Sequence, residues 1–276
     1  TSGFNASAWD VAQITRGPGG QLRGLSCAAP PIRAFDVLKP VHVTDLGPGI
    51  KVYDLGQNAS IMPRLTVTGP AGITVKVIPS ELIRPNGDIE DIACRGNSYL
   101  TYTHDGGPAR TWQPTFYYRG ARYLRVECSK DAQLESIEGV VVHSSSTPVG
   151  EFACSNDLFN RIHTLIRWAQ RSNMVSVMTD CPHREKLGWL EQYHLNGPSL
   201  RYEFDLAALF TKGMNDMADS QLENGLMPNI APEYVIFPQG GETHLRESVE
   251  WGAALIEVPW QQYLWSGDIE LMRRFY

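Results

Sequence analysis

The chain has 276 residues and a formal net charge of -6 at pH 7, with 42% apolar and 20% charged residues. These values are typical of a globular protein that can bury the core of one large or two ordinary domains. The acidic residues are scattered and no run of Lys or Arg occurs, which argues against a nucleic-acid partner or an anionic membrane surface. No apolar stretch is long enough to span a membrane, and no signal peptide is recognisable, although a signal cleaved before Thr1 is compatible with this.

The five cysteines are far apart and odd in number, which suits neither a C-x-x-C metal site nor a disulfide framework. We expect mostly buried thiols at Cys27, Cys94, Cys128, Cys154 and Cys181. The seven histidines are dispersed and no H-E-x-x-H spacing occurs. The sequence therefore predicts neither a metal site nor a cofactor.

The first half of the chain has the sequence pattern of an antiparallel sheet domain. Residues 1–40 are rich in Gly and Pro, and we interpret them as a linker or the tail of a preceding domain. From Val41, short β-forming runs alternate with Gly- and Pro-rich turns at spacings of about ten residues, the pattern of a β-sandwich. We assign residues 41–147 to this sandwich, with strands at 51–53, 64–67, 74–78, 99–103, 122–127 and 137–143.

After the polar segment 144–148 the hydrophobic period changes from two to about 3.6 residues, which predicts helices. The first helix should follow an N-cap at Ser155 or Asn156 and bury the apolar face Leu158, Ile162, Leu165, Ile166 and Ala169. Further helices are expected at about 198–223 and 247–265. Residues 148–276 thus form an all-helical layer, and its wide apolar faces lead us to expect a fragment of a larger protein.

The segment 178–193 reads M-T-D-C-P-H-R-E-K-L-G-W-L-E-Q-Y and places ionisable side chains among apolar ones. Such mixed surroundings separate the pKa values of neighbouring carboxyls, so Asp180 and Glu185 are candidates for an acid and a charged partner. Pro182 predicts a loop that leads into a helix beginning near Arg184. Lys186 should point away from Glu185, because adjacent helical residues diverge. The alternative is a charged, solvated first turn with Trp189 in the core.

Several motifs carry a family resemblance: Y-D-L-G-Q-N at 53–58, P-T-F-Y-Y-R-G-A-R at 114–122, D-C-P-H-R-E-K-L-G-W at 180–189, P-N-I-A-P at 228–232 and V-P-W-Q-Q-Y at 258–263. With them the chain resembles the bacterial α-L-rhamnosidases of glycoside hydrolase family 78, in the six-hairpin glycosidase superfamily. The resemblance implies an inverting hydrolase in which an antiparallel β-sandwich is followed by an (α/α)6 barrel. This chain would hold only the first part of that barrel, apparently truncated.

The resemblance also assigns roles to single residues. Glu185 matches the general acid, whereas Asp180 and Arg184 match residues that line the rhamnose subsite. The general base would be a glutamate beyond Tyr276. The family commonly continues G-W-T-G-D, but this chain has G-W-L-E-Q at 188–192, which leaves the exact sugar open. The predicted substrate-binding residues are Arg184, Trp189, Glu191, Gln192, Glu250 and Trp251.

Each of these assignments has a structural alternative. Trp189 and Trp251 suit the apolar face of a sugar ring, but tryptophans of a helical domain also fill its core. Asp180 would tune Glu185 by its charge or would only cap the following helix. Glu250, beside Trp251, is interpreted as a group at the inner end of the barrel.

Three functions compete at this point. The first is hydrolysis of terminal α-L-rhamnose from a glycoside or polysaccharide. The second is a lyase that acts on a rhamnose–uronate linkage, suggested by the missing acid at Gln192. The third is a carbohydrate-binding protein without catalysis. The expected partners are a rhamnose-containing carbohydrate and the rest of the same polypeptide, which would complete the barrel. We expect a soluble bacterial protein, and the sequence does not decide between periplasm and cytoplasm.

Overall fold

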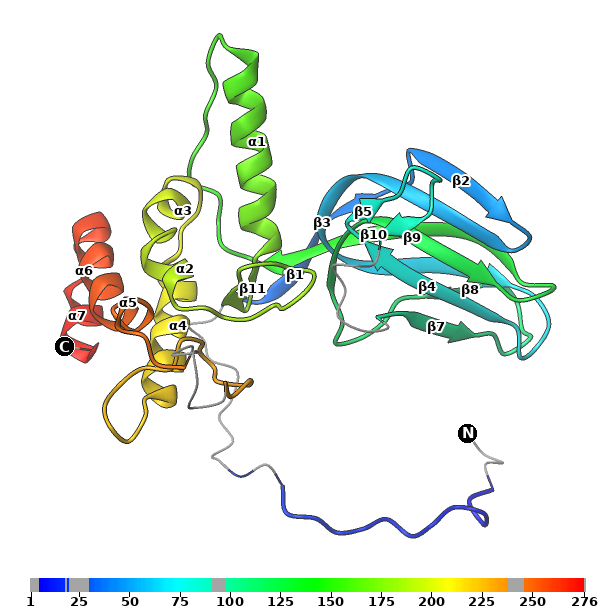
Figure 1. Cartoon of the computed structure of the whole chain (residues 1–276), viewed down its shortest axis with the longest axis horizontal. Coiled ribbons are helices and arrows are strands. Elements are labelled where there is room, and N and C mark those ends of the chain that lie inside the picture. Colours follow the sequence, from blue (N-terminus) through cyan, green and yellow to red (C-terminus); the bar gives the residue numbers. More distant parts are fainter. Residues whose placement is uncertain (1–4, 18, 20–29, 91–97, 238–245, 276) are drawn as a thin grey trace.

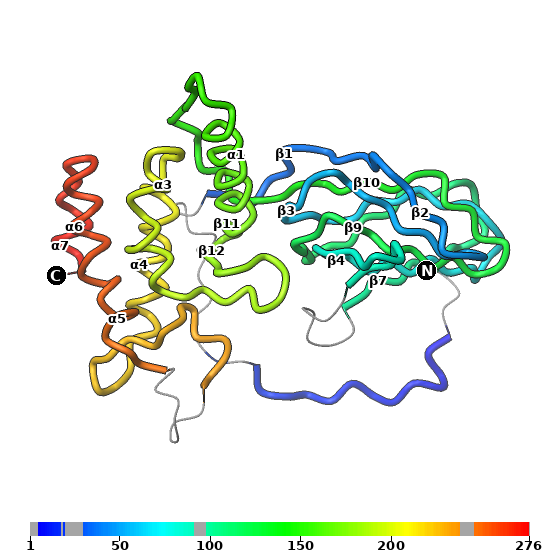
Figure 2. Tube along the Cα trace, turned by 45° about the horizontal axis from the view of Figure 1, so that its top comes forward, coloured from blue at the N-terminus to red at the C-terminus, as the bar shows by residue number. Residues whose placement is uncertain are grey.

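The computed structural model describes residues 5–275 except 18, 20–29, 91–97 and 238–245. A β-sheet domain lies at one end of the molecule and a group of helices at the other (Figure 1). Helix α1 (Asp157–Ser172) stands between them in both views (Figures 1 and 2). The order of the elements, strands first and helices after, agrees with the predicted fold class.

Eight strands form one antiparallel sheet in the order β1-β10-β3-β9-β4-β7, and β2 and β8 also pair with β3. Every predicted strand lies within one of them or overlaps it. The strands are β1 (Ile32–Leu38), β2 (His42–Gly47), β3 (Ile50–Thr68), β4 (Thr74–Ser80), β7 (Leu100–Thr103), β8 (Arg110–Trp112), β9 (Arg119–Cys128) and β10 (Gln133–Ser144). A small hairpin, β5 (Leu82–Ile83) and β6 (Ile89–Glu90), follows β4.

The long strand β3 pairs with different neighbours along its length. Residues 50–54 pair with β2 and β9, and residues beyond Ala59 pair chiefly with β10 and β8. The register with β9 shifts between Asp54 and Ala59, where Gly56 has a left-handed φ of 77°. Alternate side chains of β3 then face one core, which is built around Leu55, Ile61, Leu65, Val75, Leu124 and Val141.

Strand β1 corrects the assignment of residues 1–40 to a linker. It pairs with β10 along the edge of the sheet, with Arg33 opposite His143. The Phe35 ring stacks on the His143 ring at a centroid distance of 3.8 Å. This cross-strand contact stabilises an edge strand whose short sequence has no clear alternation of its own.

Helix α1 begins where predicted, since the Asn156 side chain accepts a hydrogen bond from the Leu158 N–H at 3.0 Å. Its predicted apolar face is not buried, however. Leu165 is 70% exposed, and Leu158, Ile162 and Ile166 are also exposed. The side of α1 that packs is the one with Trp168, which lies against the sheet core.

Two predicted long helices are each interrupted. The helix expected at 198–223 is divided into α3 (Gly197–Glu203) and α4 (Ala207–Ser220). The break occurs because the backbone near residue 204 forms hydrogen bonds with residues 147–149, which connect the two domains. The Asp205 N–H donates to the Thr147 carbonyl at 2.8 Å, and Phe204 is extended and buried. The helix expected at 247–265 is α5 (Val249–Gly252) and α6 (Ala254–Ser266), which α7 (Ile269–Phe275) follows.

The helical domain has its own core, separate from that of the sheet. The largest buried side chains in it are those of Tyr193, Phe204, Phe210, Leu209 and Met214. Short elements complete the domain: β11 (Met174–Val175) pairs with β12 (Val177–Met178), and α2 (Glu191–His194) packs on α6. The segment between β12 and α2 carries the predicted site.

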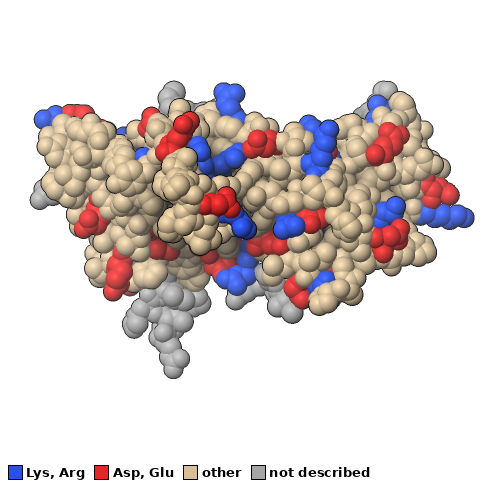
Figure 3. All heavy atoms as spheres, turned by 90° about the horizontal axis from the view of Figure 1, so that it is seen from above, with Lys and Arg blue, Asp and Glu red and all other residues tan. Residues whose placement is uncertain are grey.

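The expectation of buried thiols is wrong for the cysteines that can be assessed. Cys128, Cys154 and Cys181 are free, Cys154 is exposed and the other two are half-buried. Cys27 and Cys94 lie outside the described residues. Among the described residues on the face in Figure 3, acidic and basic side chains alternate without an extended basic patch. Within the described part of the chain, no helix is both long and apolar enough to cross a membrane.

Candidate functional site

The residues 179–190, which we call the acidic loop, connect β12 to α2. The helix expected to begin near Arg184 is not formed: residues 182–185 make a turn, and helix begins only at Glu191. Lys186 has a left-handed φ of 53°, which interrupts any helix. The Tyr234 hydroxyl donates to the Lys186 carbonyl and accepts from the Gly188 N–H at 3.2 Å. A side chain therefore satisfies backbone groups that a helix would have paired.

The acidic loop also rests on the sheet domain. The Gly120 N–H of β9 donates to the Pro182 carbonyl at 2.8 Å. The Lys186 ammonium donates to the Tyr118 carbonyl at 3.1 Å and lies 4.5 Å from the centre of the Tyr118 ring. Lys186 thus points away from Glu185, as predicted, although a turn and not a helix directs it there.

His183 and Glu81 form a second contact between the domains. His183 Nδ1 lies 3.4 Å from Glu81 Oε2, and the side chain of His183 is only 3% exposed. Burial lowers the pKa of His183, and the positive charges of nearby side chains act in the same direction. Glu81 partly offsets this effect, because its charge raises the same pKa.

Three carboxyls of the acidic loop and its continuation lie close enough to interact. Burial raises the pKa of Asp180, and the charge of Glu185 raises it further. Burial is also the main cause of the raised pKa of Glu191, to which Asp180 adds a smaller contribution. Asp180 is therefore electrostatically coupled to both glutamates. The two carboxyls that their surroundings bias toward the protonated form are Asp180 and Glu191.

Neighbouring side chains orient the two glutamates. The Arg184 guanidinium donates to Glu185 Oε1 at 2.7 Å. The Gln192 amide donates to Glu191 Oε1 at 3.0 Å and accepts from the Asn196 amide at 2.6 Å. Gln192, which departs from the family pattern, thus holds Glu191 in place.

Two of the predicted aromatic residues adjoin this cluster. The Trp189 and Trp251 rings pack edge to face, with centroids 6.5 Å apart, and Trp189 also stacks on Phe237 at 5.4 Å. The Trp251 indole approaches Glu191 closely enough to lower its pKa slightly against the effect of burial. Glu250 lies on α5 with an exposed side chain, and no contact among the described residues joins it to the carboxyls.

Three of the twelve buried side-chain atoms that lack a hydrogen-bond partner among the described residues lie in the cluster. Within the described part of the chain, Asp180 Oδ1 is buried and makes no hydrogen bond, and Glu191 Oε2 and Trp251 Nε1 are buried with no partner at full hydrogen-bond geometry, although the indole acts on Glu191 as a weak donor. Leaving such groups unpaired costs free energy, so their presence needs an explanation, and binding of a polar ligand is one. Hydroxyl groups or water could donate to the two carboxylates and accept from the indole.

Sequence reasoning missed Glu81, Tyr118 and Tyr234. Burial, together with the charge of Asp180, raises the pKa of Tyr234, which places this tyrosine beside the cluster. Glu81 and Tyr118 come from the sheet domain, which no local pattern connects to the acidic loop. Only a tertiary structure could reveal their role.

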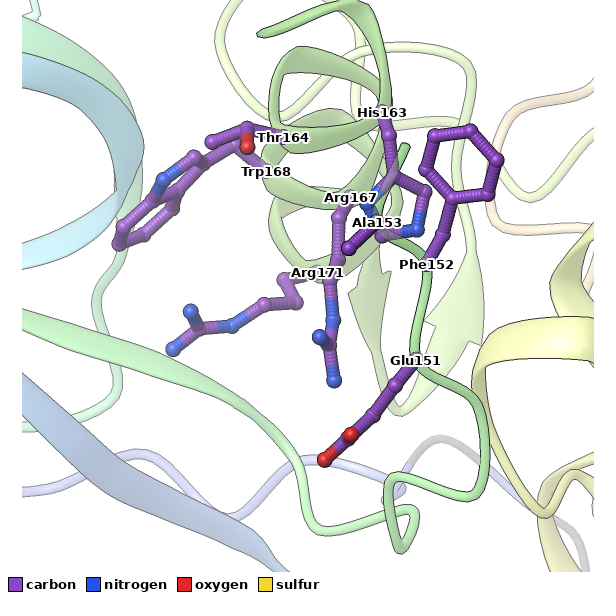
Figure 4. Close-up of a pocket in the computed structure, with 8 residues that line it drawn as sticks. All are labelled: Glu151, Phe152, Ala153, His163, Thr164, Arg167, Trp168 and Arg171. Carbon is purple, nitrogen blue, oxygen red and sulfur yellow. The ribbon is translucent and has the colours of Figure 1, made fainter. Parts of the chain in front are cut away.

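A cavity of about 650 Å³ lies between α1 and residues 151–153 (Figure 4). The guanidinium groups of Arg167 and Arg171 extend into it, and Trp168 and Phe152 lie on either side. None of the predicted site residues lines it. No group of three or more His, Cys, Asp or Glu side chains suited to a metal ion occurs in the residues that the structure describes.

Comparison with known proteins agrees with this architecture. Residues 44–143 match the bacterial alpha-L-rhamnosidase concanavalin-like domain, and residues 147–276 match the bacterial alpha-L-rhamnosidase 6 hairpin glycosidase domain. The chain thus joins a concanavalin-like sheet domain to a six-hairpin glycosidase domain. It belongs to the bacterial α-L-rhamnosidase family, as its motifs predicted.

Individual relatives support the same assignment. An α-L-rhamnosidase of Streptomyces avermitilis is 34% identical over 88% of this chain and 23% of its own length. One from Formosa agariphila is 28% identical over 100% of this chain and 30% of its own length. The structure of an α-L-rhamnosidase from Dictyoglumus thermophilum superposes with a TM-score of 0.85 at 32% identity, covering 99% of this chain and 30% of that one.

The Streptomyces avermitilis enzyme complexed with L-rhamnose superposes with a TM-score of 0.81 at 33% identity. The superposed region covers 90% of this chain and 24% of the Streptomyces avermitilis chain. The chain therefore spans only about a quarter to a third of the length of these relatives.

Proposed function

We propose that the polypeptide containing this chain is a glycoside hydrolase that removes terminal α-L-rhamnose from glycosides or polysaccharides. The observation that carries the proposal is the set of buried polar atoms on Asp180, Glu191 and Trp251 that lack a partner at full hydrogen-bond geometry, beside Glu185. It lies inside the matched six-hairpin glycosidase domain. A polar ligand with several hydroxyl groups, such as a sugar, suits these donors and acceptors.

In the proposed mechanism, Glu185 protonates the glycosidic oxygen as the general acid. Asp180 and Arg184 hold the sugar, and the charge of Asp180 acts on its neighbours. A second carboxylate on the opposite face of the sugar activates water, which leads to inversion at the anomeric carbon. We assign this base to a glutamate beyond Tyr276, in the part of the polypeptide that completes the barrel.

Glu191 is the alternative acid. Burial raises its pKa, and the Gln192 amide fixes its orientation. An acid that must carry a proton near neutral pH needs such surroundings. Comparison of variants at Glu185 and Glu191 therefore decides the assignment.

The test uses the complete polypeptide. It is incubated with p-nitrophenyl α-L-rhamnoside and with rhamnosylated glycans, and released rhamnose is measured. Nuclear magnetic resonance of the first product identifies its anomer, and β-L-rhamnose from an α-linked substrate would show inversion. Absence of rhamnose release from every substrate would contradict the proposal, whereas an unsaturated uronate product would indicate the lyase.

A further inference from the structure

The sheet domain holds the part of the acidic loop that lies between Asp180 and Glu185. The Pro182 carbonyl accepts from the Gly120 N–H at 2.8 Å. A Cβ atom at Gly120 would lie 2.6 Å from Pro182 Cγ and 2.9 Å from Glu81 Oε1. Only a glycine on β9 therefore allows the loop and Glu81 to come this close.

Glu81 connects the adjoining residue, His183, to two further parts of the sheet domain. One carboxylate oxygen lies 3.4 Å from His183 Nδ1, and the other accepts from the Asn58 amide at 3.0 Å. Asn58 belongs to the segment of β3 where the register shifts, and Glu81 directly follows β4. The carboxylate is thus fixed from the sheet side before it meets the loop.

The negative charge of Glu81 balances cationic side chains around His183. The positive charges of Arg119, Arg184 and Lys186 all act on the imidazole, and the negative charge of Glu81 opposes them. Removing Glu81 would take away both the carboxylate 3.4 Å from the buried His183 Nδ1 and the negative charge that balances Arg119, Arg184 and Lys186 around the loop. Repulsion among these cationic side chains would then favour a shift of the loop.

Such a shift would reach both carboxyls, because Pro182 and His183 lie between them in the chain. We propose that Glu81 is a positioning residue that acts through His183 on Asp180 and Glu185, so that the sheet domain takes part in assembling the active site. This inference rests on the proposed function, since it concerns the geometry of the same reaction.

The experiment compares variants of the complete polypeptide. Glu81→Ala should lower kcat on a rhamnoside with a poor leaving group by about 10- to 100-fold, because small misplacements of catalytic groups have effects of this order. KM should change much less. An activated aryl rhamnoside should lose less turnover, since its leaving group depends less on a positioned acid. Glu81→Gln keeps the acceptor for Asn58 but loses the negative charge, so it should recover only part of the activity.

Glu90→Gln is the matched control. Glu90 and Glu81 have the same side-chain exposure of 26%, but Glu90 pairs with Arg84 in the β5–β6 hairpin. This variant should retain wild-type kcat on both substrates. The proposal would be overturned if Glu81→Ala behaved like Glu90→Gln, or if it lost turnover equally on both substrates together with thermal stability.

Two measurements keep the proposal testable in other circumstances. If Glu81→Ala does not fold, Gly120→Ala replaces it. Gly120→Ala should lower kcat more on the rhamnoside with the poor leaving group than on the activated one, and an unchanged kcat would reject the proposal. Hydrogen exchange of residues 179–190 should be faster in Glu81→Ala than in Glu90→Gln, even if the wild type shows no rhamnosidase activity. Equal exchange would overturn the positioning role, whereas inactivity of the wild type concerns only the proposed function.

Discussion

At the scale of single residues, three carboxyls within twelve positions of the chain experience three different surroundings. Glu185 Oε1 accepts from a guanidinium, Glu191 is held by an amide, and Asp180 has a buried oxygen without a partner in the described part of the chain. Environment assigns different tasks to chemically similar groups. We therefore expect substitutions at the three positions to have different signatures.

The pH dependence of stability tests the surroundings of Glu191. Its pKa is raised above the ordinary value of 4.5, chiefly by burial. The folded protein then holds this proton more tightly than the unfolded chain, so stability falls as the pH rises from 4.5 through the raised pKa. Glu191→Gln removes this loss. Its melting temperature relative to wild type should increase between about pH 4 and about pH 7.

Glu250→Gln serves as the control for this measurement, because Glu250 is exposed and has no contact with the cluster among the described residues. Its melting temperature relative to wild type should not depend on pH. A pH-independent difference for Glu191→Gln as well would show that Glu191 is not desolvated in solution.

Asp180→Asn tests sugar binding. Loss of a hydrogen bond to a charged group costs about 1.5–3 kcal/mol, or roughly 10- to 100-fold in affinity. We expect this variant to weaken kcat/KM on activated and natural substrates alike, as measured by steady-state kinetics. A loss confined to the natural substrate would instead assign Asp180 to proton transfer.

At the scale of elements, the sequence predicted what local patterns determine. The strands of the sheet follow alternation and turn residues, and α1 begins at its Asn156 cap. The break at 204–206 was missed because it depends on hydrogen bonds to residues 147–149. The acidic loop was mistaken for a helix start because Tyr234 and Tyr118, which hold it, are distant in sequence. Motifs thus indicated the candidate site residues, whereas the residues that hold the loop could be found only from the fold.

Tyr234→Phe tests these supports. The substitution removes a hydroxyl that bonds to the Lys186 carbonyl and the Gly188 N–H. Each such hydrogen bond contributes about 0.5–1.5 kcal/mol, so local opening of the acidic loop should become several-fold more frequent. Hydrogen exchange of residues 185–190 should accelerate while exchange in the strands stays unchanged. Unchanged exchange at Gly188 would contradict the account.

At the scale of the whole molecule, two apolar surfaces of the helical domain face solvent. One is the face of α1 with Leu158, Phe159, Ile162, Leu165 and Ile166. The other lies between α6 and α7, where Ile256, Pro259, Trp260, Met272 and Phe275 line a mostly apolar groove. Contiguous exposed apolar surface usually marks an interface. We propose that the rest of the polypeptide covers both surfaces as it completes the barrel.

Leu165→Glu tests whether the rest of the polypeptide covers this face of α1. In the complete polypeptide the new carboxylate would be buried without a partner, which should cost about 2 kcal/mol or more and lower the melting temperature. In residues 1–276 alone, where Leu165 is 70% exposed, the same substitution should have little effect. Equal melting temperatures for wild type and variant in the complete polypeptide would show that this face stays exposed.

The central claim is that Glu185 donates the proton to the departing glycosidic oxygen, and turnover of Glu185→Gln on two substrates tests it most directly. General acid catalysis contributes about 10²–10⁴-fold, so kcat on a natural rhamnoside should fall by that order. Turnover of an activated aryl rhamnoside should fall much less, and sugar affinity should be retained. Near wild-type turnover of Glu185→Gln on the natural substrate, with a large loss in Glu191→Gln, would contradict the assignment and move the acid to Glu191.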